Sequence, residues 1–328
     1  MTSSATSSDT LRMLVLETDD PHPKTLSERG SFGQIFHDLF ESAGASHSPH
    51  PLKIETSMHF VVDDADEGKY GRVPRYEEIG EDVGAILISG SMYDAHGDDE
   101  WILQLLQLLQ HLWSRRPLIK FSGVCFGHQL LNRMLGCQVR QHAGQKWELS
   151  HTQMNLTPIG KKLFRTDEDT LALHQMHQDQ VTDAPTPKTS NGLLEPDTRV
   201  HIWASSEHTK VQGIYIRDRL FTSQGHLGFD DTMVHRQIQL RKEAGSIDES
   251  DEMEVAQARE KAHLEQDGVV VAAAILRFFH GEDHDVDIDE SDKMEVAQAR
   301  EKAHLEHDGV VVAAAILRFF HGEDHDVE

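Results

Sequence analysis

The sequence predicts an α/β protein of three layers, in which a mostly parallel β-sheet is covered by helices on both faces. Strand-like and helix-like segments alternate up to about residue 135, and short strands follow one another after Gln138. Strand-helix alternation that passes into consecutive strands is typical of a parallel sheet with an antiparallel edge. The chain has 328 residues, which is enough for one large domain with a full core.

The elements follow from the spacing of apolar residues. Apolar runs predict strands at 12–17, 53–62, 85–89 and 116–124. Apolar residues on one helical face predict helices at 32–42, 101–113 and 127–135, and the second of these has a broad apolar face suited to covering the sheet. Shorter strands are expected at 152–157, 171–176, 201–205, 211–216 and 220–223, with a surface loop at 183–196.

The most informative motif is Gly123-Val124-Cys125-Phe126-Gly127-His128-Gln129, between a predicted strand and a predicted helix. It has the form G-x-C-x-G, the cysteine counterpart of the serine nucleophile elbow. A sharp turn crowds the positions two before and two after the nucleophile, where glycine fits best. The helix N-terminus is expected to lower the thiol pKa. The motif therefore predicts a nucleophile, although a lone cysteine is often only a small buried hydrophobe.

Three further segments agree with this motif in order and spacing. They are Ala-Ile-Leu-Ile-Ser-Gly-Ser at 85–91, Met-His-Gln-Asp-Gln-Val at 176–181 and Ser-Gln-Gly-His at 223–226. Together the four motifs resemble the class I (triad-type) glutamine amidotransferase superfamily, and in particular its stand-alone fungal and plant branch with γ-glutamyl peptidase-like enzymes. The resemblance implies a flavodoxin-like amidotransferase fold over residues 11–287, in which 247–287 form the C-terminal helical segment.

The resemblance also implies roles for individual residues. Cys125 would be the nucleophile and His226 the base that takes its proton. Backbone donors for the oxyanion are expected at Gly90, Ser91 and Phe126, and substrate contacts at Gln129 and His177. For His177, a hydrogen-bond network within its loop is an equally good interpretation. The resemblance implies no cofactor and no metal.

One position departs from the family pattern. The family's acid follows its histidine by two positions, in Gly-His-Pro-Glu, whereas this chain has Gly225-His226-Leu227-Gly228. The acid of a triad holds the imidazole in the productive tautomer and stabilises the imidazolium. Asp230 is the candidate substitute. Either the enzyme is slower, or it recruits another acid, or it has lost activity.

These features predict a cysteine hydrolase or transferase that acts on glutamine or a γ-glutamyl compound through a thioester. The sequence has no pyrophosphatase loop, P-loop or dinucleotide-binding glycine pattern, so it predicts no second catalytic domain. Two alternatives remain open. One is the glutaminase subunit of a separate synthetase, and the other is a catalytically impaired binding or regulatory protein with the amidotransferase fold.

The resemblance implies a small-molecule substrate, glutamine or a γ-glutamyl compound, as the partner, and composition argues against two other classes of partner. The formal net charge of −25 argues against nucleic acid, and no apolar stretch is long enough to span a membrane. Two cysteines cannot make a disulfide framework, so a reducing compartment, the cytoplasm, is expected. Cys137 is expected to fill the core. Residues 1–10, rich in serine and threonine, are expected to be a disordered tail.

The acidity is concentrated in a C-terminal tandem repeat. Residues 247–287 and 288–328 match with an offset of 41 residues and differ only at 252/293, 266/307 and 287/328. Each copy is predicted to form an amphipathic helix (253–265 in the first) and an apolar helix ending near 279. The body can hold one copy, so the second would expose 310–320 and favour self-association. The His-Gly-Glu-Asp-His-Asp runs at 280–285 and 321–326 lack a ligand framework, so no metal site is expected.

Overall fold

The computed structural model describes residues 10–144, 146–283 and 286. The chain divides into two units, residues 1–285 and 286–328, and the description concerns the first. The predicted tail up to residue 9, the second repeat copy at 288–328 and the self-association expected from it lie outside the described residues.

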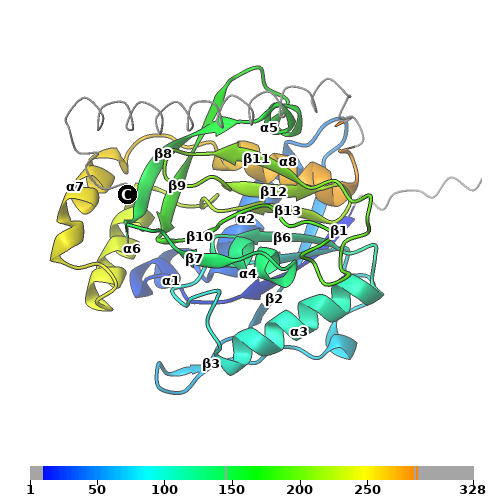
Figure 1. Cartoon of the computed structure of the whole chain (residues 1–328), viewed down its shortest axis with the longest axis horizontal. Coiled ribbons are helices and arrows are strands. Elements are labelled where there is room, and N and C mark those ends of the chain that lie inside the picture. The colour runs from blue at the N-terminus through cyan, green and yellow to red at the C-terminus, as the bar shows by residue number, and fades with distance from the viewer. Residues whose placement is uncertain (1–9, 145, 284–285, 287–328) are drawn as a thin grey trace, which may run out of the picture. The chain divides into compact units, whose positions relative to one another are not determined.

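A nine-stranded sheet forms the centre of the domain, in the order β2-β1-β5-β6-β13-β12-β11-β8-β9 (Figure 1). The first five strands in this order are parallel: β2 (Lys53–Phe60), β1 (Thr10–Glu17), β5 (Ala85–Ile88), β6 (Lys120–Val124) and β13 (Leu220–Ser223). The remaining four are antiparallel: β12 (Gly213–Ile216), β11 (His201–Ser205), β8 (Glu148–Leu156) and β9 (Thr170–His177). The predicted parallel sheet with an antiparallel edge is confirmed.

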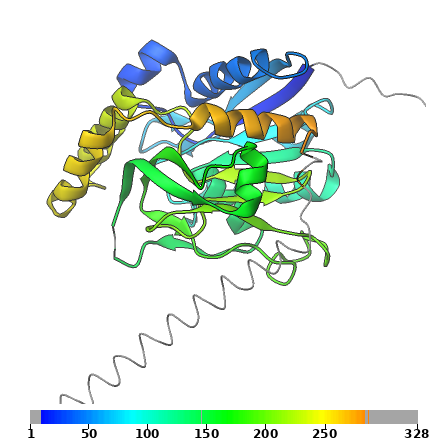
Figure 2. The same ribbon diagram turned by 90° about the horizontal axis from the view of Figure 1, so that it is seen from above.

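Helices cover both faces of this sheet (Figures 1 and 2). On one face, α2 (Phe32–Ala45) packs against α8 (Gly268–His280) and against β1 and β2. On the other, α4 (Phe126–Met134) packs on β5 and β6, and α3 (Glu100–Arg115) packs against α4. The smaller helices are α1 (Pro23–Arg29), α5 (Pro158–Phe164), α6 (Asp231–Glu243) and α7 (Glu252–Lys261). Two small two-stranded antiparallel sheets pair β3 (Asp63–Asp64) with β4 (Lys69–Tyr70) and β7 (Val139–Gln141) with β10 (Asp179–Val181).

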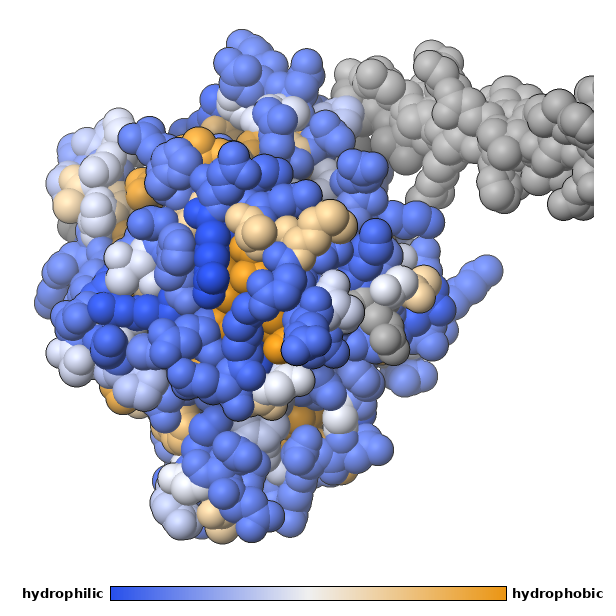
Figure 3. Space-filling model, turned by 90° about the vertical axis from the view of Figure 1, so that its left-hand side faces the viewer, coloured by the Kyte–Doolittle hydropathy of each residue, from blue (hydrophilic) through white to orange (hydrophobic). Residues whose placement is uncertain are grey.

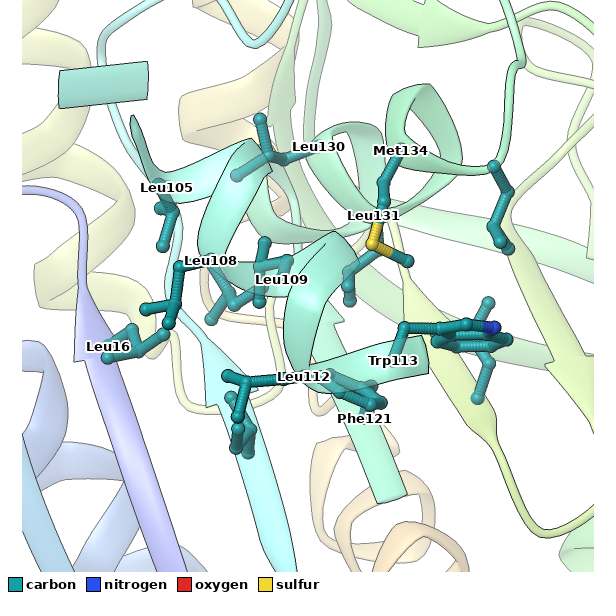
Figure 4. Packing of buried hydrophobic residues seen from close by; sticks show 14 of the residues in the cluster. Leu16, Leu105, Leu108, Leu109, Leu112, Trp113, Phe121, Leu130, Leu131 and Met134 are labelled. Carbon is teal, nitrogen blue, oxygen red and sulfur yellow. The ribbon is translucent and has the colours of Figure 1, made fainter. Parts of the chain in front are cut away.

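The helix predicted at 101–113 is α3, and its apolar face is buried in the core between α3, α4 and the sheet. Leu105, Leu109 and Leu112 of α3 are fully buried and belong to one hydrophobic cluster with Phe121 of β6 and Leu131 of α4 (Figure 4). The predicted filler Cys137 packs, partly buried, against the same cluster. On the side of the molecule seen in Figure 3, most of the surface is hydrophilic. None of the described helices is long and apolar enough to cross a membrane.

Several predicted boundaries are wrong for identifiable reasons. The strand predicted from residue 116 begins at Lys120, because Arg116 caps the end of α3 and Leu118 lies on the surface with 89% of its area exposed. β1 begins at Thr10, two residues before the strand predicted at 12–17. The helix expected to end near residue 265 ends at Lys261.

Three helices were not predicted. α6 has few apolar residues and therefore shows little helical periodicity, although Asp230 caps its first turn by accepting from the amide of Met233. α1 and α5 are short, but each begins with a capped proline turn. The Thr157 hydroxyl caps α5 by accepting from the Gly160 amide, and Pro158 follows it directly. These capping residues were the available signal.

The first repeat copy is fixed to the body by two of the positions at which the copies differ. Glu252 pairs with Lys242 at 2.6 Å. The Gln266 amide accepts from the backbone amide of His174 at 3.1 Å and donates to the carbonyls of Leu227 at 3.3 Å and Phe229 at 2.5 Å. The second copy has lysine and histidine at these positions, Lys293 and His307. These contacts therefore favour the first copy over the second as the segment that packs on the rest of the domain.

Two deletions test this preference. Deleting 288–328 or 247–287 gives proteins of equal length that differ at only three positions. We expect the protein that keeps the second copy to have a lower free energy of unfolding by about 1–2 kcal/mol, because it loses the Gln266 hydrogen bonds and brings Lys293 against Lys242. Urea unfolding measures the difference. The reversions Lys293→Glu and His307→Gln should recover it, and equal stabilities would contradict the argument.

Candidate active site

The order of the sheet brings three loops together. β5, β6 and β13 are adjacent and parallel, with Ile88 paired with Gly123 and Ser223 with Val124. The carboxyl ends of parallel neighbours lie at the same edge of a sheet, where α/β proteins bind ligands. Gly90, Cys125 and His226 follow these three ends. The sequence motifs that were predicted to act together are therefore adjacent.

Cys125 occupies a strained turn between β6 and α4. Its φ of 54° lies in the left-handed region, which non-glycine residues rarely adopt. A Cβ atom at Gly123 would lie 2.4 Å from the backbone of Gly127, and one at Gly127 would lie 2.3 Å from the carbonyl oxygen of Ile88. The predicted steric role of both glycines is confirmed. The turn presents the thiol at the N-terminus of α4.

Gly90 lies between the cysteine and the histidine. A Cβ atom at Gly90 would be 3.0 Å from Cε1 of His226 and 3.5 Å from Cβ of Cys125. The two side chains thus approach the same point, which is open only because residue 90 has no side chain. In this structure, no hydrogen bond joins the thiol to the imidazole among the described contacts.

The thiol of Cys125 has a higher pKa than the sequence predicts. Cys125 is buried, and this burial raises its pKa to about 11. The charge of Arg241 and a hydrogen bond from the Phe126 amide act in the opposite direction, and so does the nearby Gln224 amide. The helix N-terminus was expected to lower the pKa, but removal from water outweighs it. In the resting state Cys125 is a thiol.

His226 is a neutral imidazole held by packing. Its ring stacks on Phe229 with centroids 3.9 Å apart, and its amide donates to the His174 carbonyl at 2.8 Å. Burial above all, with His177, Arg241 and His174 acting in the same direction, lowers the pKa of His226 to about 3. The buried Nε2 has no hydrogen-bond partner within the described part of the chain. An unpartnered imidazole nitrogen can accept a proton from the thiol or from water.

Asp230, the candidate substitute acid, has partners other than His226 in the structure. Asp230 caps α6 and pairs with Arg29 at 2.8 Å, and its side chain is half exposed. Its contacts differ from those expected of a triad acid. At Gly228, where the family has glutamate, a Cβ atom would meet only Cγ2 of Ile35, at 2.9 Å. His226 therefore lacks a carboxylate partner among the described residues.

The side chains of the two predicted substrate contacts, Gln129 and His177, have different hydrogen-bond partners. Gln129 lines the cavity and donates to the Asp179 carbonyl at 2.9 Å and to the Gln224 side chain at 3.1 Å. His177 also lines the cavity, but both of its nitrogens face protein acceptors, the Asp179 carbonyl at 2.8 Å and the Glu148 carboxylate at 2.9 Å. These hydrogen bonds favour the interpretation of His177 as part of a network.

Glu148 is the buried centre of that network and was not predicted. Besides His177, it accepts hydrogen bonds from the Ser206 hydroxyl at 2.6 Å, the Thr209 hydroxyl at 2.9 Å and the Gln212 amide at 3.0 Å. Burial opposes its ionisation, but the donors, His177 above all, hold its pKa below the ordinary value. The donors come from distant segments, so no local sequence signal could have found it.

A cavity of about 200 Å³ opens beside Cys125. Its walls include four residues of the predicted set: Ser91, Phe126, Gln129 and His177. Arg241, from the last turn of α6, also lines it, together with Trp147, whose ring lies 4.9 Å from the guanidinium. Arg241 was missed because the whole of α6 was missed. Cys125 and Arg241 line this cavity, whereas His226 lines a smaller one that Arg241 also borders.

The comparisons with known proteins agree with this geometry. Residues 71–238 match the model of the glutamine amidotransferase class-I family, and the chain belongs to this family. It is 25% identical over 264 residues to a glutamine amidotransferase-like protein of Schizosaccharomyces pombe, covering 80% of this chain and 96% of that protein. It is 31% identical over 196 residues to a Saccharomyces cerevisiae protein named as a glutamine amidotransferase, covering 59% and 70%.

A plant relative and two solved structures extend the comparison. Gamma-glutamyl peptidase 3 of Arabidopsis thaliana is 30% identical over 161 residues, and the match covers 48% of this chain and 58% of that protein. A glutamine amidotransferase from Thermotoga maritima superposes with a TM-score of 0.54 at 18% identity, over 85% of this chain and 99% of that one. One from Methylobacillus flagellatus gives 0.50 at 17%, over 80% and 94%. The structural matches show the fold.

The raised thiol pKa predicts the pH dependence of alkylation. Only the thiolate reacts, so a pKa near 11 should make the rate of Cys125 labelling by iodoacetamide rise about tenfold per pH unit between pH 7 and 10. Peptide mapping separates Cys125 from Cys137, whose pKa burial raises to about 12. A rate that stays level across pH 6–8 would instead reveal a thiolate-imidazolium pair and contradict the prediction.

Proposed function

We propose that this protein is a cysteine-dependent hydrolase or transferase that cleaves the side-chain amide of glutamine or of a γ-glutamyl compound. The observation that carries the proposal is the meeting of Cys125 and His226 at Gly90, on the carboxyl ends of three adjacent parallel strands. The Arabidopsis gamma-glutamyl peptidases among the relatives support γ-glutamyl compounds as substrates. Neither step below requires a cofactor.

In the first step, Sγ of Cys125 attacks the γ-carbonyl carbon and forms a C–S bond. The carbonyl electrons move to oxygen, and the oxyanion accepts hydrogen bonds from the Phe126 amide and from the backbone at Gly90 and Ser91. The thiol proton passes to the imidazole of His226 and from there to the departing nitrogen. The C–N bond breaks, the amine leaves, and a thioester remains on Cys125.

In the second step, water attacks the thioester carbonyl. His226 takes a proton from this water, the C–S bond breaks, and the sulfur leaves with that proton as a thiol. The product is a γ-carboxylate. If an amine takes the place of water, the same step transfers the γ-glutamyl group. His226 acts without an acid partner in both steps, so turnover is expected to be slow compared with that of a complete triad.

One observation favours a second function. The resting thiol and imidazole are both uncharged, and His226 has no carboxylate partner among the described residues. A binding or regulatory protein that retains the amidotransferase fold would show the same features. A glutaminase subunit of a separate synthetase remains a further alternative, which co-purification with a synthetase would support.

The proposed setting is a reducing compartment, the cytoplasm. Both Cys125 and Cys137 are free in the structure, and a catalytic thiol must stay reduced to act. The partner is a small molecule, because the cavity at Cys125 has room for an amino acid rather than for a polymer.

A glutamine-analogue electrophile tests the enzymatic proposal directly. We expect 6-diazo-5-oxonorleucine to label Cys125 stoichiometrically, because its diazoketone places an electrophilic carbon where the γ-carbonyl would lie. Intact mass and peptide mapping identify the labelled residue. The Cys125→Ala variant is the control and should not be labelled. A folded wild-type protein that remains unlabelled at neutral pH would support the binding protein.

Restoring the family's acid tests whether His226 is the base. A glutamate at position 228 needs room near Cγ2 of Ile35, so we combine Gly228→Glu with Ile35→Ala. We expect hydrolysis of a γ-glutamyl anilide to increase by about 10²-fold, because the carboxylate stabilises the imidazolium. Gly228→Gln with Ile35→Ala is matched in shape but uncharged and should give no increase. Equal rates in the two double variants would contradict the role of His226.

A further inference from the structure

Three side chains that can bind a metal ion meet outside the cavity at Cys125. The helices α2 and α8 pack against each other on one face of the sheet (Figure 2). His47 follows the end of α2, His280 is the last residue of α8, and Glu282 comes two positions later. One ligand atom from each lies within 4.8 Å of the other two, and the described part of the chain has no second group of this kind.

Both imidazole rings contact the same carboxylate. Nε2 of His47 lies 3.1 Å from Oε1 of Glu282, and Nδ1 of His280 lies 2.8 Å from the same oxygen. An ionised carboxylate only accepts hydrogen bonds, so each of these nitrogens must carry a proton in this arrangement. A metal ion that replaces the two protons would receive a lone pair from all three side chains.

Hydrogen bonding within the protein does not account for this cluster. Nε2 of His280 is buried and has no hydrogen-bond partner within the described residues. His177 differs, because each of its ring nitrogens faces a protein acceptor. Buried polar atoms of a side chain that serves only the fold are normally paired, and an unpaired one calls for an explanation such as a bound ion.

The chain holds these ligands in place from both sides. The His47 amide donates to the Gly44 carbonyl in the last turn of α2 at 3.1 Å. On the other side, Asp283 follows Glu282 directly, is buried and accepts a hydrogen bond from the Tyr215 hydroxyl. Because the backbone on either side is already fixed, binding an ion would order few further groups.

The surroundings favour a cation. The last carbonyls of α2 and α8 give the ends of both helices a partial negative charge. Lys120 is the positive side chain near Gly281, and its charge is already compensated. Its ammonium group donates to the Phe278 carbonyl at 2.6 Å and lies 3.5 Å from the Asp218 carboxylate.

We propose that His47, His280 and Glu282 bind a Zn²⁺ ion that fastens the first repeat copy to α2. Two imidazole nitrogens and one carboxylate oxygen are ligands that Zn²⁺ prefers, whereas Mg²⁺ and Ca²⁺ prefer oxygen ligands. Water would complete a tetrahedral set, since 29% of the Glu282 side chain is exposed. The site is independent of the proposed function, because its ligands do not line the cavity at Cys125.

The fold supplies what the local sequence lacks. The run at 280–285 was expected to bind no metal because it has no ligand framework, and His47 provides one from a distant element. The second copy has the same His-Gly-Glu-Asp sequence at 321–324, but the chain has only one His47. Only the copy that packs beside α2 can therefore complete the site.

Titration of the metal-free, full-length protein with Zn²⁺ tests this assignment by calorimetry. We expect one tight site per chain. His47→Ala, His280→Ala and Glu282→Gln, the last of which keeps the shape of the side chain, should each weaken it by at least about 100-fold. His321→Ala changes the equivalent residue of the second copy and should leave the affinity unchanged. A loss in His321→Ala but not in His280→Ala would overturn the assignment.

Thermal unfolding measures whether the ion fastens the segment. Zn²⁺ at about 100 times its Kd should raise the Tm of the wild type by about 5 °C, and a chelator should reverse the rise. Mg²⁺ at the same concentration should have no effect. The Glu282→Gln protein, shown to be folded by circular dichroism, should lose the rise. An equal rise in wild type and Glu282→Gln would overturn the proposal.

Co²⁺ in place of Zn²⁺ identifies the ligands by absorption. An ion held by two imidazoles and a carboxylate should absorb in the visible range as a four-coordinate ion, without a sulfur-to-metal band in the near ultraviolet. A sulfur-to-metal band would place the ion on Cys125 or Cys137, the two thiols of the chain, and would overturn the proposal.

Discussion

The candidate site depends on close backbone packing at the end of β6. Gly127 lies so near the carbonyl of Ile88 in β5 that any side chain would collide with it, and Gly123 lies equally near Gly127. This packing holds Cys125 at a positive φ, a conformation that costs free energy and persists only where its surroundings enforce it. The cavity opens beside this turn, and the loops that carry Gly90 and His226 follow the two strands next to β6.

Burial decides the electrostatics of the site. It raises the pKa of Cys125 and lowers that of His226, so the pair is uncharged at rest although a helix N-terminus and Arg241 favour the thiolate. The buried carboxylate of the region, Glu148, stays ionised because it accepts several hydrogen bonds. Burial therefore leaves Cys125 and His226 uncharged but Glu148 charged, because several hydrogen-bond donors surround the Glu148 carboxylate. A substrate that brings charge into the cavity changes this balance.

The motif loops are connected by hydrogen bonds as well as by the sheet. Glu148 holds His177, which donates to the Asp179 carbonyl, and the same carbonyl accepts from Gln129 beside the thiol. The hydrogen bonds at both ring nitrogens of His177 hold the 177–179 segment, whose Asp179 side chain lines the cavity. The network thus positions one wall of the site.

The sequence by itself determined the fold class, the nucleophile turn and the family, because each depends on local patterns: apolar periodicity, glycines at fixed spacing and four ordered motifs. The tertiary structure decided the rest. Asp230 forms an ion pair with Arg29. Both ring nitrogens of His177 are hydrogen-bonded within the protein. Arg241 lines the cavity although its helix, α6, shows little apolar periodicity. These outcomes depend on which distant groups meet and how deeply they are buried, and neither is recorded in local sequence.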